Sequence, residues 1–147
     1  MIEKLKILAE NVRQTISTVI SESEYVDCEL QNFPSGSCEV ASVITGLYLK
    51  KVGIENVSQS VGKRQIHNDI NTNNHVWITV DSKYIVDITA NQFNDCNEKF
   101  IVSEQSEFHN SFKVYDTRPV DFSYLTRCGS EGYGSFYAKV LEKLENT

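Results

Sequence analysis

The stretch that decides the fold of this chain reads SGSCEVASVI, residues 35–44. Small residues lead to Cys38, and an apolar pattern typical of a helix follows it. A thiol in the first turn of a helix lies near free backbone N–H groups and the positive end of the helix dipole, which favour the thiolate. The stretch therefore predicts a helix that begins with a nucleophilic cysteine.

The predicted helix covers residues 38–52 and is buried on more than one side. Ser37 is the expected N-cap. Gly53 is expected just past the end of the helix, where glycine is favoured. The apolar positions on which this prediction depends are Val40, Ala41, Val43, Ile44, Leu47, Tyr48 and Val52.

Two further helices are predicted near the ends of the chain. Apolar residues recur every three or four positions over 2–20 and again over 135–145, which indicates amphipathic helices. Shorter patterns predict the strands, and polar or turn-forming residues predict the loops. The expected strands are 54–63, 100–102 and 112–115, and the expected loops are 21–37, 64–74, Pro119 and Gly129–Gly134.

The clearest strand signal is a hairpin over residues 75–88, where apolar and polar positions alternate. Directly opposed residues of an antiparallel pair share a face. The register that gathers the apolar positions onto one face also places His75 and Asp87 together on the other. A three-residue turn at 80–82 would pair the two directly. The apolar positions are Val76, Ile78, Val80, Tyr84, Val86 and Ile88.

Asp87 is the residue of this hairpin that most needs a partner, because a buried carboxylate is costly when unpaired. Its structural partner would be a set of helix-terminal N–H groups, and its functional partner would be His75. His67 and His109 lie in polar sequence without a patterned acid and are ranked lower. We therefore expect Cys38, His75 and Asp87 to meet as nucleophile, base and orienting acid.

Neighbouring residues have expected supporting roles. Trp77 shares the face of His75 and would shield the imidazole–carboxylate contact or fill the core. Thr89 would orient the aspartate. An oxyanion would be stabilised by the backbone N–H of Cys38 and by a second donor from Gln31 or Asn32.

Composition limits the class of protein. A chain of 147 residues predicts one domain over 1–147. A net charge of −6 argues against nonspecific nucleic-acid binding and against an anionic membrane surface. No apolar run approaches the ~20 residues needed to span a bilayer, and the N-terminus lacks a signal-peptide pattern. The expected location is the cytoplasm, or a host cell reached by a route independent of a signal peptide.

The cysteines do not predict a metal centre. They lie far apart, without a CxxC or HxxxH spacing, so neither a structural zinc site nor another metal site is expected. In a reducing compartment they would be free thiols. No organic cofactor is expected either. The four positions are Cys28, Cys38, Cys96 and Cys128.

Three short motifs together resemble the transglutaminase-like branch of the papain-like thiol enzymes, whose pattern is roughly G-x-C, H-x-W and D-x-T. The matching residues are Gly36-Ser37-Cys38, His75-Val76-Trp77 and Asp87-Ile88-Thr89. The resemblance covers about residues 35–93. It implies an α+β papain-like fold, in which a nucleophile helix packs on an antiparallel sheet flanked by N- and C-terminal helices.

The resemblance also implies chemistry. Cys38 would be the nucleophile, His75 the general base and acid, and Asp87 the orienting carboxylate. The chain departs from the pattern at Glu39, where an aromatic residue often stands, and at Ile88, where a proline often stands. Its length is closer to that of small bacterial peptidases, deamidases and toxin-type members than to that of crosslinking transglutaminases.

The implied function is a thiol hydrolase, of the cysteine peptidase or glutamine deamidase type, that cleaves amide bonds of a peptide or protein through a thioester. Two alternatives stay open at this stage. One is a transglutaminase or another acyltransferase with the same triad, and the other is a non-catalytic binding or adaptor module on the same fold. The rate at which iodoacetamide modifies Cys38 distinguishes an enzyme from an adaptor.

Overall fold

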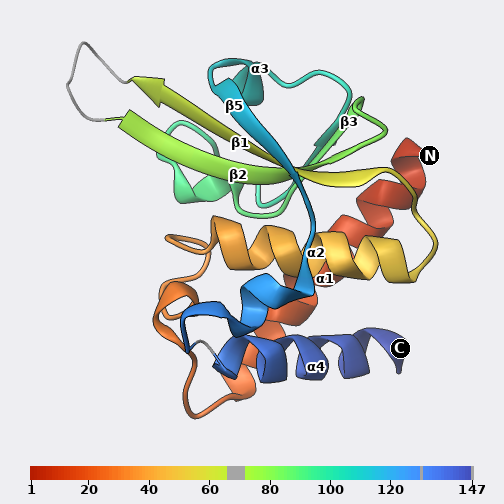
Figure 1. The fold of residues 1–147 in the computed structure, drawn as a ribbon, viewed down its shortest axis with the longest axis vertical. Coiled ribbons are helices and arrows are strands. Elements are labelled where there is room, and N and C mark those ends of the chain that lie inside the picture. The colour runs from red at the N-terminus through yellow and green to blue at the C-terminus, as the bar shows by residue number, and fades with distance from the viewer. Residues whose placement is uncertain (66–71, 130, 147) are drawn as a thin grey trace.

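The computed structural model describes residues 1–65, 72–129 and 131–146. Over these residues the chain is α+β, with four α-helices and a five-stranded antiparallel sheet of order β4-β3-β2-β1-β5 (Figure 1). The elements are α1 (Ile2–Glu22), η1 (Cys28–Leu30), α2 (Cys38–Lys51), β1 (Val57–Gln65), β2 (Thr72–Val80), β3 (Tyr84–Asp87), η2 (Ala90–Gln92), β4 (Ile101–Ser103), α3 (Glu107–Asn110), β5 (Lys113–Pro119), η3 (Phe122–Gly129) and α4 (Glu131–Glu145).

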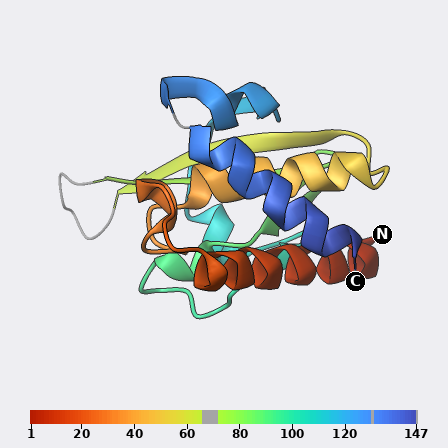
Figure 2. The same ribbon diagram turned by 90° about the horizontal axis from the view of Figure 1, so that it is seen from below.

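Helix α2 lies between the sheet and α4, and α1 crosses behind α2 and contacts β3, β4 and α4 (Figures 1 and 2). The helix packs closely on the sheet because Gly46 has no side chain. A Cβ atom there would lie 2.9 Å from Ile78 Cδ1 and 2.7 Å from Val120 Cγ2. The core around the helix is formed by buried aliphatic side chains, among them Leu5, Val12, Ile44, Leu49, Ile78 and Val140.

Both ends of α2 lie close to their predicted positions. Gly53 has φ +96°, and the N–H of Ile54 donates to the carbonyl of Leu49 at 3.0 Å, which is the bond that closes a helix before a C′ glycine. Ser37 occupies the N-cap position. Its hydroxyl, however, donates to the carbonyl of Glu29 at 2.5 Å instead of accepting from the helix.

The β2–β3 hairpin confirms the predicted faces but not the predicted pairing. The turn comprises Asp81–Lys83, so Val80 pairs with Tyr84 and Ile78 with Val86. If this pairing continues by one residue, Asp87 lies opposite Trp77. The position opposite His75 is then two residues after Asp87 in the chain. A shift of two keeps every side chain on its face. His75 and Asp87 are therefore diagonal neighbours, still within reach of each other.

Several loop predictions were wrong at their edges. The ladder between β1 and β2 continues through Arg64 and Asn73, so 64–65 and 72–74 are strand, while 66–71 lie outside the described residues. Backbone hydrogen bonds between the two strands hold these residues in the sheet, and such bonds do not depend on whether the side chains are polar. Pro119 ends the edge strand β5, where its missing N–H is tolerated. The first strand begins at Val57, three residues later than expected.

The glycine-rich segment before the last helix was also predicted wrongly. Gly129 ends η3, and α4 begins at Glu131, so Gly134 is helical. Tyr133 explains the early start, because it is buried and its hydroxyl accepts from the N–H of Glu29 at 3.0 Å. Tertiary packing here outweighs the low helix propensity of glycine. None of the helices in the described residues is long and apolar enough to cross a bilayer.

Candidate active site

Cys38 is the first residue of α2 and a free, partly exposed thiol. The preceding turn is held by the Ser37–Glu29 hydrogen bond and by Gly36, whose φ of +71° is strained for other residues. The backbone N–H groups of the first helical turn have no partner within the helix. The thiol thus lies beside donors that suit an oxyanion.

His75 lies on β2 with its ring completely buried. Its Nε2–H donates to Asp87 Oδ2 at 2.6 Å, so any other partner of the ring has to bind Nδ1. Burial lowers the pKa of His75, but the charge and hydrogen bond of Asp87, together with the hydrogen bond and charge of Cys38, outweigh it and raise the pKa to about 9. The structure therefore pairs His75 with Asp87 by a direct hydrogen bond, and Cys38 lies close enough to raise the pKa of His75.

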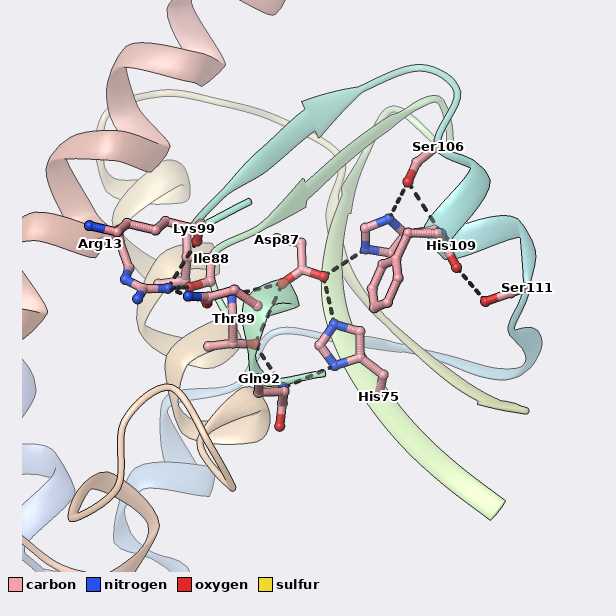
Figure 3. Close-up of polar contacts among 12 residues, drawn as sticks. Arg13, His75, Asp87, Ile88, Thr89, Gln92, Lys99, Ser106, His109 and Ser111 are labelled. Carbon is pink, nitrogen blue, oxygen red and sulfur yellow. Dashed lines mark hydrogen bonds and ion pairs between the residues drawn. The ribbon is translucent and has the colours of Figure 1, made fainter. Parts of the chain in front are cut away.

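Asp87 ends β3 and uses both carboxylate oxygens (Figure 3). Oδ2 accepts from His75, and Oδ1 accepts from the backbone N–H of Thr89 at 2.9 Å and from its hydroxyl at 3.5 Å. Burial favours the neutral acid, yet the charge of His75 and the bonds from both histidines hold the pKa of Asp87 well below its usual range. The carboxylate stays ionised, and Thr89 lies where the sequence placed it.

His109 was ranked too low by the sequence. Its Nε2 lies 2.6 Å from the same Oδ2 of Asp87, and its side chain is buried. Its Nδ1 lies 2.7 Å from the hydroxyl of Ser106, the N-cap of α3, and that hydroxyl also accepts from the backbone N–H of His109. Its acid partner is 22 residues away, so no local pattern could show the contact. His67 lies outside the described residues.

Aromatic side chains enclose the two histidines. The ring of Trp77 lies 5.5 Å from that of His75 and 4.8 Å from that of His109. Gly62 pairs with His75 across β1 and β2, and a Cβ atom at Gly62 would lie 2.9 Å from the Trp77 ring. Trp77 thus shields the imidazole–carboxylate contact, and exclusion of water strengthens these polar bonds. Three phenylalanines complete the enclosure: Phe93, Phe108 and Phe112.

The loop that follows Asp87 adds two residues that sequence reasoning missed. Gln92 Nε2 lies 3.3 Å from His75 Nδ1 and 3.2 Å from Thr89 Oγ1. Arg13, from α1, donates through one nitrogen to the carbonyls of Ile88 at 2.6 Å and Lys99 at 2.9 Å (Figure 3). Arg13 is far from Gln92 in the sequence, but its hydrogen bonds hold the loop that contains Gln92.

Glu39 follows Cys38, at the position where the resembled family often has an aromatic residue, and it forms an ion pair. Glu39 Oε1 accepts from Arg118 at 2.9 Å, and Arg118 also donates to Gln59 at 3.0 Å. These three residues line a hollow of about 280 Å³ beside the start of α2. Gln31, one of two expected oxyanion donors, is exposed and donates to Val26 in its own loop.

His75, Asp87 and His109 are also side chains of the types that bind metal ions. Among the described residues, they are the one group placed to ligate one, with donor atoms within 4.8 Å of one another. Two ligands of tetrahedral zinc lie about 3.3 Å apart. Each imidazole nitrogen here lies only 2.6 Å from the same oxygen. All three side chains are buried, so the geometry fits direct hydrogen bonds better than a catalytic metal with an open position.

No family model, curated protein or solved structure matches this chain.

Proposed function

We propose that this protein is a thiol hydrolase with a papain-like, transglutaminase-like fold, which cleaves amide bonds of a peptide or protein through a thioester on Cys38. The observation that carries the proposal is the buried His75–Asp87 contact of 2.6 Å. Cys38, the first residue of α2, lies close enough to raise the pKa of the same imidazole. Support also comes from the antiparallel sheet with α2 across it. A triad of nucleophile, base and orienting acid is recognised by geometry of this kind.

The first half of the reaction forms the thioester. The Cys38 thiolate attacks the amide carbonyl, and the backbone N–H groups at the start of α2 stabilise the oxyanion. His75 then donates its Nδ1 proton to the nitrogen of the leaving amine as the C–N bond breaks. Asp87 holds Nε2–H throughout, which keeps the ring oriented and stabilises its positive charge.

The second half releases the acyl group. Water loses a proton to Nδ1 of His75 and forms the new C–O bond, and the C–S bond breaks to restore the thiolate. If a primary amine replaces water, the same steps form an amide, which is the acyltransferase alternative. Ammonia as the first leaving group corresponds to glutamine deamidation.

Iodoacetamide labelling at pH 6, read by mass spectrometry, tests the proposal. Cys38 is expected to react at least about tenfold faster than the exposed Cys28, because a reactive cysteine is favoured at the start of a helix and beside a histidine. The Cys38→Ala variant should keep its fold and lose the fast-reacting site and all hydrolysis of a peptide library. The Cys28→Ala variant is the matched control and should retain both.

Equal labelling of Cys38 and Cys28 would contradict the proposal and favour the non-catalytic adaptor. Full hydrolytic activity in folded Cys38→Ala would contradict it independently.

A further inference from the structure

We propose that Gln92 is a further catalytic residue, which holds the water or amine that attacks the acyl-enzyme. This inference rests on the proposed function and specifies its second step. Because Asp87 occupies Nε2 of His75, the proton that moves in each half-reaction must pass through Nδ1. The side-chain nitrogen of Gln92 lies 3.3 Å from that atom.

Access to His75 supports this role. The imidazole is 0% exposed, whereas Gln92 is half-buried. The carboxamide is therefore the more exposed of the two groups that meet at Nδ1. A nucleophile that gives its proton to Nδ1 is expected to contact Gln92 there.

The chemistry of a carboxamide suits both protonation states of His75. Its oxygen accepts from Nδ1–H, and its NH₂ group donates to the unprotonated nitrogen after half a turn of the amide. The atom not used by the imidazole remains for the incoming water or amine. Two groups, Nδ1 and the carboxamide, then fix the nucleophile, and such orientation lowers the entropic part of the barrier.

The position of Gln92 does not depend on the substrate. Its side chain also donates to Thr89, which is bonded to Asp87, so Asp87, Thr89 and Gln92 close a ring on His75. Arg13 anchors the same loop from α1. The carboxamide is thus held in place before the acyl group arrives (Figure 3).

Burst kinetics with p-nitrophenyl acetate separate the two steps. The thiolate attacks the ester, the C–O bond to the leaving group breaks, and p-nitrophenolate departs without needing a proton, so acylation does not require a group at Nδ1. Water then converts acetyl-Cys38 to acetate and thiolate. In Gln92→Met, which keeps the volume but not the hydrogen bonds, the burst rate should stay within about twofold and deacylation should fall by about tenfold to a hundredfold.

Two variants complete the test. Gln92→Glu still accepts from the imidazolium but cannot donate to neutral Nδ1, so its deacylation should slow and shift to higher pH. Gln14→Met, at an exposed glutamine of α1, is the matched control and should leave both steps unchanged. Circular dichroism and thermal unfolding verify that each variant is folded.

The outcomes are distinct. Slow deacylation with a normal burst supports the inference. Equal loss in both steps, as expected of an oxyanion donor or a purely structural residue, overturns it, and so does parental deacylation in Gln92→Met. A parent protein that gives no burst and no acetylated Cys38 overturns the proposed function and this inference with it.

Discussion

His75 and His109 bind the same carboxylate oxygen but differ in the partner of their other ring nitrogen. Each Nε2 lies 2.6 Å from Asp87 Oδ2, and both rings are buried. The other nitrogen of His109 is held by Ser106, whereas the corresponding nitrogen of His75 lies 3.3 Å from Gln92 Nε2. Cys38 also acts on His75 and raises its pKa. We therefore propose that His75 exchanges a proton with a reactant and that His109 anchors the carboxylate.

The largest expected effect comes from making the same substitution at both histidines. A glutamine amide reproduces an Nε2–H donor but cannot transfer a proton. His75→Gln should therefore lower kcat for amide hydrolysis by about a hundredfold to ten-thousandfold, whereas His109→Gln should retain kcat within severalfold. Steady-state kinetics on folded variants measures this difference. Equal losses in the two variants would show that the histidines do not have separate roles.

Asp87→Asn should have the next largest effect. It removes the negative charge that raises the pKa of His75. We expect kcat to fall by about a hundredfold, and the basic limb of the pH–rate profile to move to lower pH, because the imidazolium loses its proton more easily. An unchanged basic limb would mean that Asp87 does not control the charge of His75.

A variant at position 109 that cannot donate a hydrogen bond to Asp87 tests whether His109 anchors this carboxylate. His109→Phe keeps an aromatic ring but leaves one hydrogen bond of Asp87 unmade in a buried site. It should destabilise the protein by about 1–3 kcal/mol and lower kcat by about tenfold, and His109→Gln should recover most of both losses. Urea unfolding and kinetics on the pair measure this. Failure of glutamine to recover either property would contradict an anchor that acts through its Nε2–H.

The charge on His75 also predicts how stability depends on pH. Its folded pKa, about 9, lies above the ordinary value of 6.5, so the stabilisation is fully present below pH 6.5 and is lost as pH rises through 9. The shift corresponds to roughly 3 kcal/mol in this buried group. The stability difference between the parent and His75→Gln should therefore shrink from pH 6 to pH 10 in urea titrations. A constant difference would contradict a raised pKa.

Much of the fold could be predicted from local patterns. The helices over 2–20 and 38–52 and the faces of the hairpin follow from apolar spacing, because each repeats over several turns or strand pairs. The pairing within the hairpin was wrong by two residues, since alternation fixes the face but not which turn residues close it. Asn73 and Gly134 were placed in loops because composition could not reveal the ladder and the packing that order them.

The site was predictable to a lesser degree. Cys38, His75 and Asp87 each carry a local signal: a helix start, a strand opening and a charge in an apolar strand. His109 and Gln92 carry none, because their partners come from other elements and only the tertiary fold brings them together. The unmet hydrogen-bonding capacity of a buried carboxylate was the one available sign that Asp87 needed a second donor.

Nitrogen-15 NMR of the histidine rings across pH tests the central claim most directly, since it reads the protonation of Nδ1 and Nε2 separately. We expect His75 to be doubly protonated at pH 7 and to lose its proton near pH 9, and we expect this titration to move to lower pH in Cys38→Ala. A His75 ring that is neutral at pH 7, or a titration that ignores the loss of Cys38, would contradict an imidazolium held between Asp87 and the thiol.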